Sequence, residues 1–319
     1  MADQHPDHTV KWLTVSTDQA GQRIDNFLMR CYRKVPKNLI YRVIRKGEVR
    51  VDKGRVKPHR KLRAGECVRV PPIKTAHADA QSAVIAQTQL DRIEKAILYE
   101  DADLMVINKP AGVAVHGGTG LAWGVIEVLR RLRPQAKRME LVHRLDRDTS
   151  GCLLVAKKAS VLKALHQQMR DHQVEKRYKA LVSPHWPQSQ RRVTLPLLRY
   201  TLASGERRVK VSTEGQSAES LFEPIESFTQ ADWVAVRLKT GRTHQIRVHA
   251  SALGAPVVND PKYAKEGQHR WFQQNGFTRL GLHAALLGFR HPVTEQWCVF
   301  EAPMDAALKT ILKQLRGEL

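Results

Sequence analysis

Residues 143–151 read His143-Arg144-Leu145-Asp146-Arg147-Asp148-Thr149-Ser150-Gly151, and the rest of the chain is organised around them. An apolar lead-in, Leu141-Val142, precedes this stretch, and an apolar run from Cys152 to Ala156 follows it. Asp, Ser, Thr and Gly form turns readily, because their side chains bond nearby backbone or tolerate positive φ. The pattern therefore predicts a strand, a charged turn and a second strand.

The turn holds two carboxylates, Asp146 and Asp148, among two arginines and one histidine. A loop on a rigid sheet often carries catalytic residues, whereas the plainer alternative is a surface turn whose charges compensate one another. Two paired carboxylates would also suit glycoside hydrolysis, but acids two residues apart on a tight turn need not converge. On the turn alone these alternatives stay open.

Length and composition bound the class of protein. The chain of 319 residues suggests about two domains, and its hydrophobic content of 42% suffices for a real core. No run approaches ~18 apolar residues, so we expect no transmembrane helix. Residues 1–8 lack the basic and apolar regions of a signal peptide, so we expect a cytoplasmic protein. The four cysteines are scattered without a Cys-x-x-Cys pair, which argues against a metal or redox site.

The net charge of +22 is concentrated near the N-terminus. Residues 21–75 carry 17 Lys and Arg against 4 Asp and Glu, a net charge of +13 in about a sixth of the chain. Such a surplus indicates a polyanionic partner, and its clustering is typical of a nucleic-acid-binding module. The alternative is a basic face that is only solvated.

Hydrophobic periodicity divides the first part of the chain. A tail and a strand are expected over residues 1–20. Residues 21–75 predict a helix, then a basic helix over 36–46 that Gly47 ends, and then a small sheet. The polar, Ala- and Gln-rich residues 76–92 predict a linker.

The remaining residues, 93–319, predict a second domain. Many strands with short turns and few helices favour an α+β domain over an alternating parallel one. Residues 240–249 predict a turn followed by a helix that Thr243 caps. The glycine-rich residues 113–120 lack the P-loop pattern, so we infer no nucleotide binding.

Three segments of the basic region resemble the S4 RNA-binding domain: Arg23-Ile24-Asp25, residues 44–51 and residues 64–68. The resemblance implies a small α/β RNA-binding domain over 21–75, whose cations face the phosphates of structured RNA. Some of these cations must be merely solvated. The residues that the resemblance implies for RNA binding are Arg42, Arg45, Lys46, Arg50 and Lys57.

Four segments of the second domain resemble the RluA-type family of RNA pseudouridine synthases. They are residues 108–112 (Asn-Lys-Pro-Ala-Gly), 143–151, 176–180 (Lys-Arg-Tyr-Lys-Ala) and 241–249 (Gly-Arg-Thr-His-Gln-Ile-Arg-Val-His). The resemblance implies a mixed, mainly antiparallel sheet of the pseudouridine synthase fold. It also implies isomerisation of particular uridines in large-subunit (23S) rRNA or its assembly precursor. The reaction needs no cofactor or metal, which fits the missing nucleotide and metal motifs.

The resemblance implies a role for each site residue. Asp146 is the nucleophile, a role that carboxylates have at electrophilic centres. Attack on the ribose, attack on the uracil ring and abstraction of a proton stay open as its step. Arg247 would hold that carboxylate ionised and oriented, with Arg242 as the alternative partner. Tyr178 would contact the uracil and could move its C5 proton, although a phenol pKa of about 10 makes it a poor base. Arg144 would fill the space that the extruded base leaves.

Three histidines and two rival functions complete the expectations. His143, His244 and His249 lack metal-ligand spacing, so we expect hydrogen-bonded scaffold histidines. One rival is a non-catalytic S4-type RNA-binding or ribosome-assembly protein, which would bind RNA with or without Asp146. The other is a hydrolase that releases free base or cuts the strand. A monomer without a membrane partner is the simplest assembly.

Overall fold

The computed structural model describes residues 9–32, 35, 37–72, 85–117, 121, 123–136, 138–187, 189 and 191–318. The chain forms two compact units, Met1–Val84 and Ile85–Leu319. The boundary falls inside the expected linker, of which residues 76–84 lie outside the described part. Residues 87–94 of that linker form a helix instead. Within the described ranges, no helix is long and apolar enough to cross a membrane.

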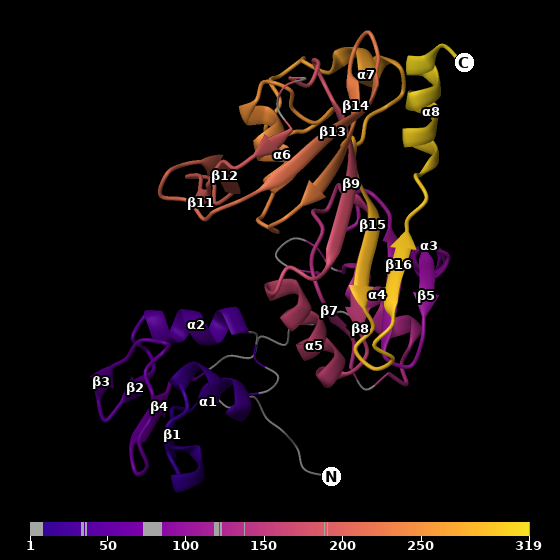
Figure 1. Ribbon diagram of the computed structural model, residues 1–319. Coiled ribbons are helices and arrows are strands. Elements are labelled where there is room, and N and C mark those ends of the chain that lie inside the picture. Colours follow the sequence, from indigo (N-terminus) through magenta and orange to yellow (C-terminus); the bar gives the residue numbers. More distant parts are fainter. Residues whose placement is uncertain are drawn as a thin grey trace. The chain divides into compact units, whose positions relative to one another are not determined.

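The N-terminal unit is a small antiparallel sheet packed against two helices (Figure 1). Its sheet order is β1-β4-β2-β3, so the strand expected as part of a tail is in fact an edge strand of this unit. The apolar faces of both helices and of the sheet share one core, which includes Ile24, Phe27, Ile44 and Val68. Its elements are β1 (Lys11–Thr14), the 3-10 helix η1 (Thr17–Gln19), α1 (Ile24–Cys31), α2 (Lys37–Arg45), β2 (Arg50–Val51), β3 (Gly54–Arg55) and β4 (Cys67–Val70).

Two local features explain why this unit folds as its sequence predicts. Asp52 and Lys53 both have positive φ, the conformation that a two-residue hairpin turn between β2 and β3 requires. Asp25 is buried at the start of α1, where it accepts hydrogen bonds from Arg23 and from the hydroxyl of Tyr41. The burial of this carboxylate is tolerated because its oxygens are bonded.

The C-terminal unit is built on a ten-stranded sheet in the order β10-β13-β14-β9-β15-β8-β6-β5, with β16 on β15 and β7 on β8. Every pairing in the described sheet is antiparallel except that of β15 with β8, so the mixed, mainly antiparallel sheet is confirmed. The strands are β5 (Ile97–Glu100), β6 (Leu104–Lys109), β7 (Glu140–Leu141), β8 (Ser150–Ala156), β9 (Glu175–Val182), β10 (Arg192–Val193), β13 (Ser220–Ser227), β14 (Asp232–Leu238), β15 (Leu282–Arg290) and β16 (Trp297–Glu301).

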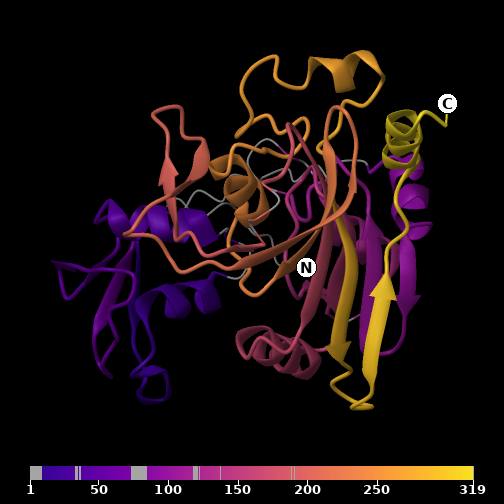
Figure 2. The same cartoon turned by 45° about the horizontal axis from the view of Figure 1, so that its top comes forward.

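The remaining elements lie around this sheet. A separate two-stranded sheet stands apart from it, and Figure 2 shows this hairpin projecting from the unit. The hairpin consists of β11 (Leu197–Thr201) and β12 (Arg207–Val211), and the helices are α3 (Gln87–Glu94), α4 (Val125–Leu132), α5 (Ala159–Arg170), α6 (Gln245–Ala252), α7 (Arg270–Gln274) and α8 (Ala306–Arg316).

Strand β8 is buried on both faces, as its continuous apolar run requires. Leu153 and Val155 pack in the core that contains α4, while Leu154 packs in the core that contains α5. This alternation follows from the two-residue period of a strand. The strand is packed between two layers, and it therefore anchors the end of the turn formed by residues 143–149.

Gly151 is required by the parallel pairing of β8 with β15. Its φ is +110°, and a Cβ at this position would lie 2.1 Å from the carbonyl oxygen of Ala284. Backbone is rigid, so only glycine fits there. The Ser-Gly that ends the charged stretch thus serves the sheet.

Candidate active site

The charged turn lies between β7 and β8 and is held from beneath by a buried lysine. Nζ of Lys109 donates hydrogen bonds to the carbonyl oxygens of Arg147, Val113 and Pro110 at 2.9, 2.8 and 2.8 Å. Burial lowers the pKa of Lys109 to about 7. Within the turn, the amide of Thr149 donates to the carbonyl oxygen of Asp146 at 3.2 Å. These hydrogen bonds therefore fix residues 146–149 of the turn.

The hydroxyl of Ser150, at the end of the turn, bonds to neighbouring elements. Its Oγ lies 2.8 Å from Nδ1 of His283 and accepts a hydrogen bond from Nη2 of Arg279 at 3.0 Å. Arg279 is also paired with Asp305, at the start of α8. These contacts tie the first residue of β8 to β15 and to the C-terminal helix.

Asp146 is paired with Arg247, which projects from α6. Nη1 of Arg247 donates to Oδ2 of Asp146 at 2.9 Å, and the side chain of Arg247 is 4% exposed. The other side of the guanidinium forks onto Asp260, with Nε and Nη2 each 2.7 Å from a carboxylate oxygen. Burial favours the neutral guanidine, but the charges of Asp260 and Asp146 outweigh it and raise the pKa of Arg247. The arginine is thus a permanent cation held between two carboxylates.

His244 is also at this site and is not only a scaffold residue. Its Nε2 lies 3.8 Å from Oδ2 of Asp146, and its Nδ1 lies 2.6 Å from the hydroxyl of Tyr263. Burial lowers the pKa of His244, although Asp146 acts in the opposite direction. The ring of Tyr263 also lies under the guanidinium of Arg247, 5.2 Å from its centre. Histidine and tyrosine together support the Asp146–Arg247 pair from one side.

The backbone at His244 corrects the predicted start of the helix. His244, not Thr243, is at the N-cap position of α6, and it has a left-handed φ of 53°. That conformation is uncommon outside glycine but is tolerated by Asn, Asp and His more than by other residues. It places the imidazole ring beside Asp146.

Asp146 and Tyr178 line one cavity of about 550 Å³. Asp146 is the only carboxylate among the described residues that line it, and the cations that line it are Arg144, Arg170, Lys176, Arg242 and Arg247. Tyr178, in β9, is 9% exposed; burial, and then the charge of Asp146, raise the pKa of its phenol. A single anion surrounded by cations suits a polyanionic substrate that must place one reacting centre at that anion.

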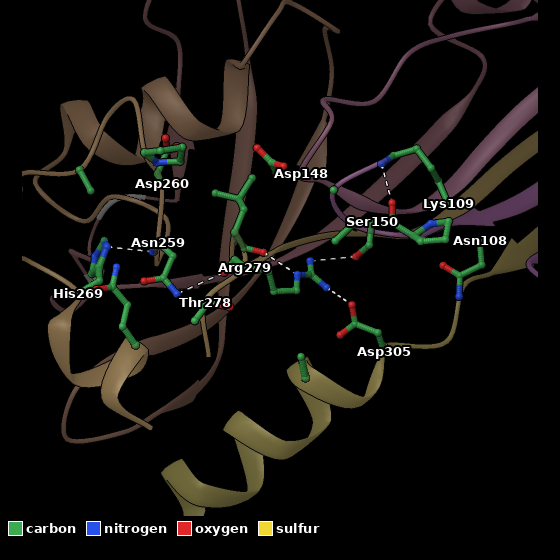
Figure 3. A pocket seen from close by; sticks show the side chains of 18 of the residues that line it. Asn108, Lys109, Asp148, Ser150, Asn259, Asp260, His269, Thr278, Arg279 and Asp305 are labelled. Carbon is green, nitrogen blue, oxygen red and sulfur yellow. Dashed lines mark hydrogen bonds and ion pairs between the residues drawn. The ribbon is translucent and has the colours of Figure 1, made fainter. Parts of the chain in front are cut away.

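Asp148 lines a different cavity, of about 1310 Å³, and does not converge with Asp146. Figure 3 shows Asp148 above Ser150 and Arg279 in this second cavity. Its Oδ1 lies 4.0 Å from Nε of Arg147. The paired-carboxylate geometry that glycoside hydrolysis requires is therefore not formed by these two acids.

The alternative partner of Asp146 is engaged elsewhere. Nε of Arg242 donates to the carbonyl oxygen of Ser217 at 3.0 Å, so Arg247, and not Arg242, pairs with Asp146. Arg144 is exposed at the rim of the cavity, with Nη2 3.4 Å from the hydroxyl of Thr243.

His143 and His249 are hydrogen-bonded scaffold residues, as predicted. Nε2 of His143 accepts from the amide of Leu154 at 3.1 Å, and burial lowers the pKa of His143 to about 4. His249 is fully buried, with Nδ1 3.0 Å from the hydroxyl of Ser220 and Nε2 2.9 Å from the carbonyl oxygen of Leu195.

The cations expected to bind RNA in the N-terminal unit are all exposed. Arg42 and Arg45 are on α2, and Lys46 follows it directly. Arg50 begins β2, and Lys57 follows β3. They lie on a helix end and on one end of the sheet, not on a single element.

One group of residues in the described part of the chain could hold a metal ion: Asp101, Asp103 and His291. Its carboxylates are already engaged, because Asp101 lies 3.0 Å from His291 and Asp103 lies 2.6 Å from Lys158. None of these residues lines the cavity of Asp146.

The sequence analysis assigns no role in the site to four of its residues, which are Lys109, His244, Asp260 and Tyr263. Lys109 and His244 stand within the motifs at 108–112 and 241–249, so a signal exists for both. Asp260 is in an otherwise unmarked segment, and its role depends on a contact with Arg247 that no local pattern encodes.

The part of the chain that carries Asp146, Tyr178 and Arg247 matches a known protein family. Residues 103–252 match the model of the RNA pseudouridylate synthase family. The chain is 50% identical to ribosomal large subunit pseudouridine synthase C of Pasteurella multocida, over 97% of this chain and 95% of that one. It is 49% identical to the Escherichia coli (strain K12) protein of the same name, over 97% and 98%.

A solved structure gives the same picture for the fold. Human RNA pseudouridylate synthase domain containing 4 aligns with a TM-score of 0.60 and 26% identity, covering 72% of this chain and 96% of that one.

Proposed function

The chain belongs to the RluA-type family of RNA pseudouridine synthases, and on that premise we propose that it converts uridines of 23S rRNA to pseudouridine with Asp146 as the nucleophile. The observation that carries the proposal is the isolation of Asp146 as the one carboxylate among the described residues of a cavity lined by cations, paired with the buried Arg247. The rRNA substrate is inferred from the name of the relatives that match over nearly the full length.

The reaction is an isomerisation that balances without a co-reactant. The bond between ribose C1′ and uracil N1 breaks, and a bond between C1′ and C5 forms. C5 loses its proton and N1 gains one. The site therefore needs a nucleophile, a way to hold the freed base and a path for one proton.

The hydrogen bonding of Asp146 supports its role as the nucleophile. Nη1 of Arg247 donates a hydrogen bond to Oδ2, and Nε2 of His244 lies 3.8 Å from the same oxygen. Oδ1 makes no hydrogen bond to any described residue, and the side chain is 25% exposed. Oδ1 is thus the oxygen that meets the substrate, while Arg247 fixes the orientation of the carboxylate.

Tyr178 is assigned to the base and not to proton abstraction. Its raised pKa keeps the phenol neutral at pH 7, so it cannot serve as a strong base there. A neutral aromatic ring beside Asp146 offers a stacking surface to a uracil that has left its helix. Extrusion of a base costs a few kcal/mol, which stacking and hydrogen bonds in the pocket offset. We infer that Arg144, which is exposed and lines the cavity, occupies the space left in the RNA.

The N-terminal unit is proposed to be an S4-type RNA-binding domain. Its support is the resemblance of its sequence, its two helices packed on a small sheet, and exposed cations at Arg42, Arg45 and Lys46. In this role it would supply affinity through phosphate contacts, while the C-terminal unit would supply the chemistry.

The test is the Asp146→Asn variant, assayed by tritium release from 23S rRNA transcribed with [5-³H]uridine, because pseudouridine formation expels the C5 hydrogen. Loss of the nucleophile should lower the rate by a factor on the order of 10⁴ or more. The dissociation constant for the same RNA should change by less than about threefold, since the substitution removes no cation.

The matched control is Asp148→Asn, a carboxylate in the same turn that lines the other cavity. It should keep wild-type turnover. Turnover by Asp146→Asn, or an equal loss in the control, would refute the assignment. A wild-type protein that released free uracil or cut the strand would instead be a hydrolase. One that bound rRNA with no tritium release would be a non-catalytic RNA-binding protein.

A further inference from the structure

The outer face of the N-terminal sheet carries one aromatic and three arginines in a single row. Trp12 of β1 is opposite Arg69 of β4, Arg69 is opposite Arg50 of β2, and Arg50 is opposite Arg55 of β3. Residues opposite each other in antiparallel strands share a face, with Cβ atoms about 5 Å apart. The four side chains therefore cross the whole width of the sheet.

The other face of the same strands is apolar. Val68 and Val51, each next to a member of the row, are buried in the core with the helices α1 and α2. The two-residue period of the strands therefore points the row away from the core, toward solvent. Trp12 is 55% exposed, so a large part of its surface is open to a partner.

The arginines of the row are held in place by neutral groups. Arg69 donates to the carbonyl oxygen of Glu48 at 2.9 Å, and Arg50 donates to that of Gly47 at 3.4 Å. Arg55 lies over Gly47, where a Cβ would come 2.7 Å from its Nε. In the described part of the chain, none of the three arginines is paired with a carboxylate, so their charge is uncompensated.

A groove of about 590 Å³ runs along the row. Lys46 and Lys53 line it together with the row residues, and Glu48 is the only acid among the described residues that line it. That acid lies 3.8 Å from Lys46, which leaves the other cations of the groove unpaired by it. The groove also reaches Lys46, which directly follows α2 and is one of the cations expected to bind RNA.

We propose that this groove binds an unpaired nucleotide segment of the rRNA substrate, in which Trp12 stacks on a base and Arg50, Arg55 and Arg69 contact the adjoining phosphates. The identity of the RNA rests on the proposed function. The contacts of Trp12, Arg55 and Arg69 are additional to those of the cations already expected to bind RNA, of which Lys46 and Arg50 also line this groove, and to the cavity of Asp146.

The chemistry of the row favours an unpaired strand over other partners. A double-stranded RNA helix hides its bases in a deep, narrow groove, whereas an exposed indole can stack only on a base that has left its helix. Aromatic rings interleaved with arginines on an open surface are the arrangement by which proteins hold single strands. A second copy of this chain would bring like charges together, and an apolar protein partner would leave the arginines unmatched.

The experiment measures binding of the full-length protein to a fluorescein-labelled single-stranded RNA 12-mer by anisotropy. Trp12→Ala should weaken binding by about five- to a hundredfold, the range found for removal of one stacked base. Trp12→Phe should recover most of the loss, because the ring is kept. The matched control is Trp297→Ala, which removes a tryptophan that is 50% exposed in the C-terminal unit and should leave the dissociation constant unchanged.

A second measurement separates stacking from charge. Replacing Arg50, Arg55 and Arg69 by Gln should lower the slope of log K against log salt by about 2, because each phosphate that a cation neutralises on a single strand contributes roughly 0.7 to that slope. Trp12→Ala should leave that slope unchanged. RNA should also quench tryptophan emission in the wild-type protein, and this quenching should shrink in Trp12→Phe.

An unchanged dissociation constant in Trp12→Ala, with the variant folded by circular dichroism, would overturn the proposal. So would a change of oligomeric state without a change in RNA affinity. The wild-type preparation is assayed in parallel for tritium release from rRNA. If the wild-type protein releases tritium but Trp12→Ala binds RNA as tightly as wild type, only the groove proposal is refuted. If the wild-type protein releases no tritium, the proposed function is refuted.

Discussion

Replacement of Asp260 by Asn tests whether the catalytic geometry depends on a residue that the substrate does not reach. The side chain of Asp260 is 0% exposed and that of Arg247 is 4% exposed, so their contact lies inside the protein. Oδ1 of Asp260 accepts from Nη2 of Arg247 and from the amides of Lys262 and Tyr263. Oδ2 accepts from Nε of Arg247 at 2.7 Å.

An asparagine cannot reproduce this arrangement. The amide oxygen will take the Oδ1 position, where three donors converge, and the amide nitrogen will then face Nε of Arg247. Two donors at 2.7 Å repel, so the guanidinium must move. Removing one partner of a buried ion pair lowers the free energy of unfolding by about 3–5 kcal/mol. Because Asn has the same shape as Asp, we expect a loss of about 3 kcal/mol for this variant.

The expected results are a lower stability and a lower turnover with RNA affinity unchanged. Denaturant unfolding should show a shift only in the transition of the C-terminal unit, since the chain has two units. A misplacement of Arg247 by about 1 Å can lower kcat by about 10²-fold, measured by tritium release at saturating rRNA. The dissociation constant for rRNA should stay within about threefold.

The matched control is again Asp148→Asn. Asp148 is partly exposed, and its Oδ1 lies 4.0 Å from Nε of Arg147. Removing such a surface charge should change stability by about 0.5 kcal/mol or less. If Asp260→Asn lost about 3 kcal/mol but kept wild-type kcat, the orientation of Arg247 would not depend on Asp260, and the reasoning would be refuted.

Two further predictions concern the turn and its support. Gly151→Ala should prevent folding of the C-terminal unit, because its Cβ would meet the carbonyl oxygen of Ala284 at 2.1 Å, whereas Gly112→Ala, also at positive φ but with nothing within 4 Å, should cost only about 1–2 kcal/mol; thermal unfolding of the two variants decides this. Because burial lowers the pKa of His143 to about 4, the unfolded chain binds a proton that the folded one does not between pH 6.5 and 4. Stability should therefore be fully present above pH 6.5 and fall as the pH drops toward 4, and urea midpoints should show a weaker fall in His143→Gln, whose amide oxygen can still accept from Leu154. The second prediction would be contradicted if the urea midpoint fell equally steeply with falling pH in the wild-type protein and in His143→Gln.

Local patterns account for much of the fold. The apolar run after the charged turn is β8. The apolar pattern over 125–132 predicts a helix, which is α4, and the segments 175–182 and 232–238 predict strands, which are β9 and β14. These elements are long or strongly periodic, so their own sequence outweighs tertiary context. No element is predicted over 183–231, where the structure has β10 to β13. Strands β10 to β12 are short and carry a weak signal, and Pro224 with the irregular register beside it weakens the signal of β13.

The candidate site divides in the same way. Asp146, Tyr178 and Arg247 are identifiable because each lies within a motif, and the structure brings all three to one cavity. Asp260 is not identifiable, since its importance comes only from its two bonds to Arg247. His244 is expected among the scaffold residues because its left-handed backbone, which turns the ring toward Asp146, has no sequence signature.

The linear chain already contains the chemistry available to this protein: it has a carboxylate turn and a basic N-terminal region, and it lacks a P-loop motif. These are properties of composition and of short spacings, which exist before the chain folds. Which of these groups contact one another depends on the folded arrangement. In the folded protein Asp146 and Asp148 line different cavities, and Arg247, not Arg242, pairs with Asp146. Trp12 lies in one row with three arginines across four strands. Strand register and helix orientation set those contacts, and both depend on packing between residues far apart in the chain.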